Sequence, residues 1–224
     1  MNYNLKRNPM TFFLLSITVL VFLSMQLVYG KFASSSQAVY QFGGMFGILV
    51  RTDFNQLWRL VTPIFVHIGW EHFLVNSFTL FFVGQLAESI WGSKNFLLLY
   101  ILSGIMGNIF TLQLTPNVIA AGASTSLFGL FAAITVLGVF GKNPLIKSMG
   151  KNYQALIVIN LIMNLFMPNV GIVGHLGGLI GGALGAVFLA NNLEKTLFSK
   201  RKRLVAVLFF LVILLGLLAL AYSH

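Results

Sequence analysis

Cysteine is absent from the 224 residues, and acidic residues number only four. Without cysteine the chain has no disulfide, no thiol nucleophile and no cysteine-held metal site. Charged residues of both signs make up 8% of the composition, whereas 58% is hydrophobic. A water-soluble domain of this size could not bury so much apolar surface. The scarcity of charge therefore predicts an all-α protein that crosses the membrane several times.

Long apolar runs divide the chain into seven predicted spans. They cover about 10–29, 71–90, 95–114, 122–140, 153–167, 173–190 and 204–222. The first run is too long for a signal peptide and ends without a small-residue cleavage site, so it is expected to be retained. The segment 31–70 is too apolar for a free linker and too broken for a span, which predicts a position in the membrane interface.

The formal charge of +10 comes from 14 basic residues that stand in short clusters between the apolar runs. This distribution indicates topology signals and no nucleic-acid partner. With the N terminus in the cytoplasm, eleven of the 14 fall on the cytoplasmic side, and only Lys31, Arg51 and Arg59 fall outside. The positive-inside rule therefore predicts a multi-pass protein of the cell membrane with a cytoplasmic N terminus and an external C terminus.

Polar side chains gather where spans two, four and six begin, and in this orientation all three spans run inward from the outer face. Ser124, His175, His72 and Asn76 should then share one depth, within about two helical turns of the outer surface. His72 and Asn76 are four positions apart and so lie on one helix face. His67 lies just above this layer. Ionisable groups inside spans are costly, which makes this layer the candidate functional site.

The turn Gly122-Ala123-Ser124 permits two interpretations. Small residues let membrane helices pack closely, and Ser124 would then only bond a backbone carbonyl. Alternatively, glycine allows a tight backbone path that presents Ser124 as a nucleophile to a base from elsewhere in the chain. Glycines recur every three or four positions through 171–185, so span six can approach span four closely and bring His175 to Ser124. These glycines fit helix packing under either interpretation.

Taken together, these residues resemble the rhomboid family of intramembrane serine proteases. The resemblance is carried by Trp58-Arg59, His67, the segment His72-Phe73-Leu74-Val75-Asn76, Glu88, Gly122-Ala123-Ser124, Gly174-His175-Leu176-Gly177-Gly178 and Gly181-Gly182. It covers about 10–190 and implies a six-helix bundle. The run 204–222 is similar to the added C-terminal helix of some members, so we expect one membrane domain over 1–224.

The resemblance implies a catalytic dyad in which Ser124 is the nucleophile and His175 the general base. His72, Asn76 and the backbone N–H of Ser124 would form the oxyanion hole. Phe128, four residues after Ser124, would pack against the His175 ring. Of the four acids, Asp53 and Glu71 are expected near the outer face and Glu88 and Glu194 near the cytoplasm, so no carboxylate is expected to orient His175.

Four further residues would support the site: Gly122 and His67 beside the dyad, and Trp58 with Arg59 bracing the first loop. The resemblance implies no cofactor or metal. It implies single-span membrane proteins as substrates, cut near the outer surface within the lipid bilayer. Water would reach the site through a cavity open to the outside, and span five, with few polar residues, would act as a lateral gate against span two.

Two hydroxyl residues depart from the family pattern or compete with the nucleophile. Many members have glycine directly after the nucleophile, whereas this chain has Thr125, whose β-branched side chain is expected beside the oxyanion site. Ser126 is an alternative nucleophile. At about 100° per helical residue, however, it points about 200° away from Ser124, so Ser124 is preferred.

Three other classes of protein are weighed against the protease. The segment His67-Ile68-Gly69-Trp70-Glu71-His72 invites a metalloprotease, but its spacing fits neither zinc motif. A transporter would be expected to carry midplane charges or internal repeats, and the sequence has neither. The remaining alternative is a catalytically inactive relative that binds membrane proteins. Such relatives typically lose the serine or histidine, and this chain has both.

Overall fold

The computed structural model describes residues 8–166 and 171–223. Lys6 and Arg7, which contribute to the positive-inside count, and the predicted end of span five at 167 lie outside the described residues. The longer helices are α1 (Pro9–Tyr29), α4 (Gly69–Thr79), α5 (Gln85–Leu114), α6 (Ser124–Phe140), α7 (Pro144–Phe166), α8 (Ile172–Phe188) and α9 (Lys200–Ala221). The shorter elements are Gly30–Phe32, α2 (Ser36–Gln41), β1 (Met45–Phe46), α3 (Gly47–Thr52), Phe54–Leu60, Thr62–Phe65, the π-helical turn Leu80–Gly84 and β2 (Ile119–Ala120). The helical membrane bundle expected from the sequence is confirmed.

A few of these helices meet the length and hydropathy needed to cross a membrane. Within the described residues, three helical stretches are long and apolar enough to cross a bilayer: Pro9–Phe32, Gly69–Leu114 and Lys200–Ala221. The second stretch contains Gly92 at φ 72°, a non-helical turn that divides spans two and three where the sequence predicts it. The apolar helices α6 and α8 have 17 residues each, which corresponds to about 25 Å of rise.

The start of α7 corrects a prediction. The helix begins at Pro144, not near 153, because Asn143 caps it by accepting the Leu145 N–H at 2.9 Å. The first turns carry Lys147 and Lys151, whose charges hide the helix from a hydropathy reading. Span five is therefore the apolar end of a longer helix.

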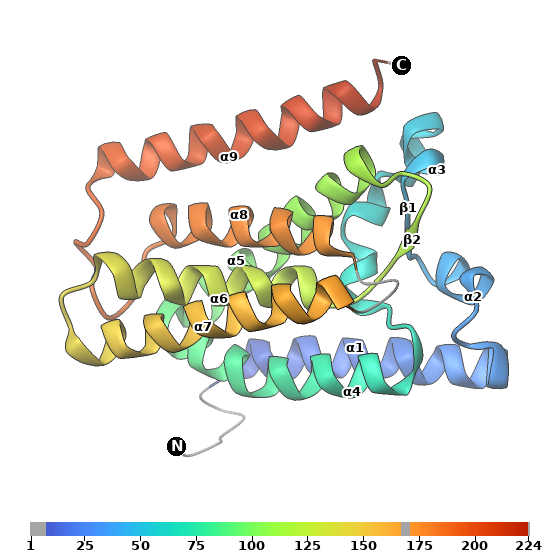
Figure 1. Ribbon diagram of the computed structural model, residues 1–224, viewed down its shortest axis with the longest axis horizontal. Coiled ribbons are helices and arrows are strands. Elements are labelled where there is room, and N and C mark those ends of the chain that lie inside the picture. The colour runs from blue at the N-terminus through green and yellow to red at the C-terminus, as the bar shows by residue number, and fades with distance from the viewer. Residues whose placement is uncertain (1–7, 167–170, 224) are drawn as a thin grey trace.

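The bundle is organised around α8, which packs between α5 and α6, while α7 covers α6 and α9 lies against α8 and α5. Figure 1 shows α9 as an outer layer beyond α8. Glycine makes the central contact close: a Cβ at Gly178 would stand 2.1 Å from the Thr125 carbonyl oxygen, and one at Gly182 would stand 2.0 Å from that of Gly129. The predicted approach of spans four and six is present.

The first loop is a folded structure that centres on a buried arginine. Nη1 of Arg59 donates to the carbonyls of Tyr40 and Gly44, both at 2.8 Å, and its Nε donates to the Gln56 side chain. The guanidinium lies 4.4 Å from the Tyr40 ring centre and 4.3 Å from that of Trp58. The planar guanidinium carries five donors, so Arg59 can form these hydrogen bonds and stack on the two rings at the same time. Arg59 and Trp58 thereby hold the first loop together.

A short antiparallel strand pair, which the sequence reasoning missed, ties this loop to the turn before α6. β1 pairs with β2 in the register Met45↔Ala120 and Phe46↔Ile119. Two residues on each side carry too little periodicity to be recognised in the sequence. The pair fixes the approach to the candidate nucleophile.

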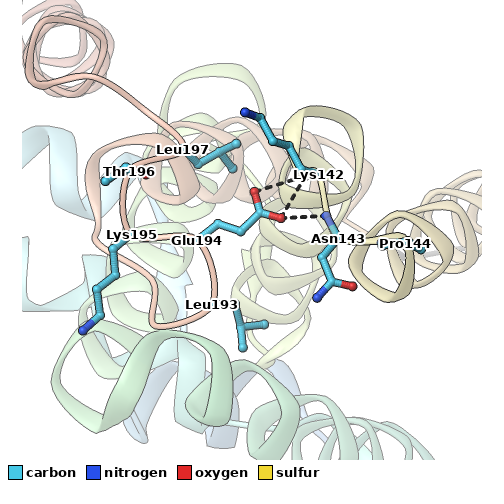
Figure 2. A pocket seen from close by; sticks show the side chains of 8 residues that line it. All are labelled: Lys142, Asn143, Pro144, Leu193, Glu194, Lys195, Thr196 and Leu197. Carbon is cyan, nitrogen blue, oxygen red and sulfur yellow. Dashed lines mark hydrogen bonds between the residues drawn. The ribbon is translucent and has the colours of Figure 1, made fainter.

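Two carboxylates hold the opposite end of the bundle. Glu88 is buried and accepts from the backbone N–H groups of Met10 and Thr11 and from the hydroxyls of Thr11 and Ser93, so it secures the start of α1. Glu194, in the connection between α8 and α9, accepts from the backbone N–H groups before α7, as Figure 2 shows.

The hollow around Glu194 has a volume of about 700 Å³. It is lined by Lys142, Asn143, Pro144, Leu193, Glu194, Lys195, Thr196 and Leu197. These residues belong to the connections α6–α7 and α8–α9, at the opposite end of α6 and α8 from Ser124 and His175. The hollow is therefore separate from the candidate active site.

Candidate active site

The turn that presents Ser124 is held by backbone and histidine contacts. Gly122 has φ 131°, a conformation that side chains disfavour, and its N–H donates to the Pro63 carbonyl at 2.8 Å. The next N–H, from Ala123, donates to Nε2 of His67 at 3.3 Å. His67 is fully buried, and its Nδ1 lies 3.4 Å from the Phe65 carbonyl. A proton on Nδ1 satisfies both contacts, so His67 fixes the turn that leads into α6.

Ser124 and His175 meet across the α6–α8 interface. Nε2 of His175 lies 2.9 Å from Oγ of Ser124, within hydrogen-bond range. The Phe128 ring stacks on the imidazole with centroids 4.2 Å apart and planes 9° apart, which is the contact that the resemblance implies. Close helix packing and the stacked Phe128 ring thus fix the orientation of the imidazole plane.

Donors converge on the space beside Gly122. A Cβ at this glycine would stand 2.7 Å from Nε2 of His72 and 3.6 Å from Nδ2 of Asn76. Asn76 is only 5% exposed, yet its Nδ2 has no hydrogen-bond partner among the described residues. Leaving a buried donor unsatisfied costs about 1–3 kcal/mol. Such a donor beside a nucleophile is suited to an oxyanion that forms only during reaction.

His72 adds a second donor to the same space. Its Nδ1 accepts a long, 3.5 Å hydrogen bond from the Ile68 N–H. In the neutral imidazole, an accepting Nδ1 leaves the proton on Nε2. That nitrogen is the one that faces Gly122, so His72 and Asn76 present N–H groups to one point.

The two hydroxyl residues after Ser124 face elsewhere. Ser126 is fully buried toward α5, where its Oγ lies 2.5 Å from the Cβ position of Gly104, so it does not approach His175. The expectation for Thr125 was wrong: its side chain packs against Gly107 and Gly174, between α5 and α8, and not beside the oxyanion space. One step of about 100° along the new helix produces this rotation.

Asp53 lies within the first loop, and its hydrogen bonds are made there. The Asn55 backbone N–H, followed by the Gln56 side chain, lowers the pKa of the Asp53 carboxyl. Both groups donate to it, at 2.9 and 3.2 Å. Asp53 therefore serves as a loop cap and is not in hydrogen-bond contact with His175.

Asn164 is the site residue that sequence reasoning missed. Its side-chain amide lies 2.8 Å from Nδ1 of His175, on the side of the ring opposite Ser124. Span five was read as poor in polar residues, and the contact joins two helices, so no single-helix spacing reveals it. The available signal was that Asn164 continues the inward stripe Tyr153, Ile157 and Leu161.

The sequence profile of the Rhomboid domain matches residues 54–192, which contain Ser124, His175, His72 and Asn76. The chain belongs to the rhomboid family. It is 32% identical to Rhomboid protease GluP of Bacillus subtilis (strain 168) over 179 residues, which are 80% of this chain and 34% of GluP. The chain thus spans about a third of GluP's length.

Two further rhomboid relatives differ in what their names state. The putative rhomboid protease YdcA of the same strain is 33% identical over 142 residues, 63% of this chain and 71% of YdcA. Inactive RHOMBOID-like protein 8 of Arabidopsis thaliana is 30% identical over 132 residues, 58% of this chain and 37% of that protein. Membership of the rhomboid family therefore leaves activity to be argued from the site.

Proposed function

We propose that this rhomboid is an intramembrane serine endopeptidase that works with a Ser124–His175 dyad. The observation that carries the proposal is the 2.9 Å contact between Oγ of Ser124 and Nε2 of His175. A buried, unpartnered Asn76 amide next to the same turn supports it. A nucleophile, a base and waiting oxyanion donors are the three parts that acyl transfer requires.

The mechanism follows from these positions. Ser124 Oγ attacks the substrate carbonyl as its proton passes to Nε2 of His175. The oxyanion accepts from Asn76, His72 and the backbone N–H of Ser124. The resulting imidazolium, stacked on Phe128, then protonates the leaving amine, which breaks the C–N bond and leaves an acyl-enzyme. Water hydrolyses that ester as His175 removes its proton, and the Ser124 hydroxyl is regenerated.

We further propose that the substrates are single-span membrane proteins that enter past α7 and are cut near the outer face of the cell membrane. Among the residues of α7, all of which are described, only Ile146 and Gly150 are buried, and both lie near its N-terminal end. The C-terminal half has no buried side chain, and its last residue, Phe166, is 78% exposed. The clusters of basic residues support a cytoplasmic N terminus and an external C terminus.

Cleavage of a single-span reporter by purified protein in detergent tests the proposal. Ser124→Ala and His175→Ala should each lower cleavage by at least about 10³-fold, because each removes one half of the dyad. Ser126→Ala is the matched control, since its hydroxyl faces α5, and should cleave normally. Activity that survives Ser124→Ala, or is lost only in Ser126→Ala, would refute the dyad.

A test of the entry route uses a reversible crosslink. Cysteine pairs introduced between the C-terminal half of α7 and the facing part of α4 should block reporter cleavage when oxidised and restore it on reduction. The absence of native cysteine makes such pairs specific. Undiminished cleavage by the fully crosslinked protein would exclude this route.

A further inference from the structure

Asn164 occupies the position at which soluble serine hydrolases place a carboxylate. Its amide lies 2.8 Å from Nδ1 of His175, while Nε2 of the same ring faces Ser124. The imidazole is therefore bridged between a hydroxyl on α6 and an amide on α7. A group at this place controls which ring nitrogen carries the proton.

The two orientations of an amide have opposite effects on the base. In the structure Nδ2 faces the ring, and if it donates to Nδ1, the ring proton must be on Nε2, which then cannot accept from Ser124. A half-turn of the amide presents Oδ1 instead, which accepts an Nδ1–H and leaves Nε2 free. Asparagine fits both arrangements without a change of shape.

Transfer of the Ser124 proton to His175 makes one orientation of the Asn164 amide lower in energy than the other. Once His175 takes the Ser124 proton, both ring nitrogens carry hydrogen, so Nδ1–H needs an acceptor. An amide oxygen satisfies it, whereas an amide nitrogen would face it donor to donor. The Oδ1 contact already satisfies Nδ1–H in the neutral ring and becomes a charge-assisted hydrogen bond when the ring is positive, so it stabilises the transition state more than the resting enzyme.

We propose that Asn164 is a positioning residue that sets the tautomer of His175 and stabilises its imidazolium through Oδ1. This role rests on the proposed Ser124–His175 dyad. It also ties the base to the entry route, since Asn164 lies in the half of α7 that has no buried side chain among the described residues. Displacing α7 to admit a substrate breaks the contact, and its return restores the base.

The chain offers a matched control for Asn164 one helical turn earlier. Asn160 is also an asparagine of α7, but its Nδ2 donates to the Leu156 carbonyl of its own helix at 2.8 Å. Asn164→Leu should lower kcat by about 10–100-fold with little change in KM, because Leu keeps the bulk and removes the acceptor. Asn160→Leu should leave both constants unchanged.

A carboxylate variant separates positioning from packing. Asn164→Asp supplies an acceptor in either orientation, so it should restore at least the unaltered kcat, with the acid limb of the kcat profile moved to higher pH. Among the described residues, His72 of α4 is the titratable group that acts on His175 electrostatically, and it is unchanged in all these variants. If Asn164 only packs, Asp should behave like Leu and the profile should not move.

Reaction with a fluorophosphonate probe reports the reactivity of Ser124 without requiring a membrane substrate to pass α7. Labelling of Asn164→Leu should be slowed about as much as kcat, and Asn160→Leu should label normally. Labelling of Asn164→Leu at the unaltered rate and pH dependence would overturn the proposal while the dyad stands. If Ser124→Ala is labelled as fast as the unaltered chain, the dyad itself is wrong and this role is excluded with it.

Discussion

A close contact between α6 and α8, one turn beyond His175, predicts how one added methyl group would disturb the site. In Gly178→Ala, the new Cβ would stand 2.1 Å from the Thr125 carbonyl oxygen, and backbone atoms cannot rotate aside. An ordinary van der Waals contact begins at 3.4 Å, so restoring it requires the helices to separate by at least about 1 Å. Overpacking of this kind costs about 1–3 kcal/mol of folding free energy.

The same displacement acts directly on catalysis, because Gly178 lies one turn after His175 and Thr125 directly follows Ser124. Adding about 1 Å to the 2.9 Å separation of Ser124 Oγ and His175 Nε2 takes it beyond hydrogen-bond range. Misplacement by this amount can lower a rate by about 10²-fold. We therefore expect Gly178→Ala to lose about 10²-fold in reporter cleavage.

Thermal unfolding in detergent and reporter cleavage should be measured together, with Gly216→Ala of α9 as the control. A Cβ at Gly216 would meet nothing within 4 Å, so that variant should be as active and at least as stable as the unaltered chain. Gly178→Ala should unfold about 3–10 °C lower. Unchanged activity and unfolding temperature in Gly178→Ala would refute the close-packing argument.

Three further variants test the contacts that support the bundle. Glu88→Gln replaces one of the two oxygens that hold the start of α1, and should lower stability by about 2–4 kcal/mol in a denaturant titration, whereas an unchanged midpoint would contradict this anchor. Arg59→Lys cannot reproduce the bonded and stacked guanidinium, so protease cleavage within the first loop should become faster. Tyr222→Phe keeps the ring and removes the 2.6 Å bond to the Val50 carbonyl, and should cost about 1 kcal/mol. Burial, followed by the charge of Asp53, raises the pKa of Tyr222, so this contribution should be complete below the ordinary tyrosine range and disappear only as pH rises through the raised value.

The convergence of the candidate site residues could be predicted from the sequence because hydropathy places the helices and a shared direction brings their first residues to the same end of the bundle. Ser124, His175, His72 and Asn76 each begin or nearly begin an apolar run, so topology alone brings them to one level. The glycines of span six predicted that it packs closely against span four, because two helices can approach closely only where no bulky side chain lies between them. Hydropathy, helix direction and glycine content can all be read from the sequence alone.

What the sequence could not supply depends on backbone direction and on contacts between helices. Thr125 lies one step of about 100° along α6 from Ser124, but that it then packs between α5 and α8 depends on how these helices are placed around α6. The start of α7 could not be predicted from hydropathy, because its first turns carry lysines. A helix can extend beyond the apolar run that marks its membrane-spanning part. Asn164 reaches His175 from another helix: the stripe Tyr153, Ile157 and Leu161 indicates that Asn164 faces inward, but the sequence does not indicate which residue it meets.

The position of Glu194 has a consequence for where this chain can be divided. The hydrophobic pattern ends the sixth span near residue 190, yet the backbone N–H groups of Lys142 and Asn143 find their acceptor only four residues later. Farther along, Phe198 is buried against Phe140. A truncation at 190 would therefore remove one contact from the end of α6 and the other from the turn before α7, and a version without the seventh helix should retain residues through Phe198 to fold as a unit.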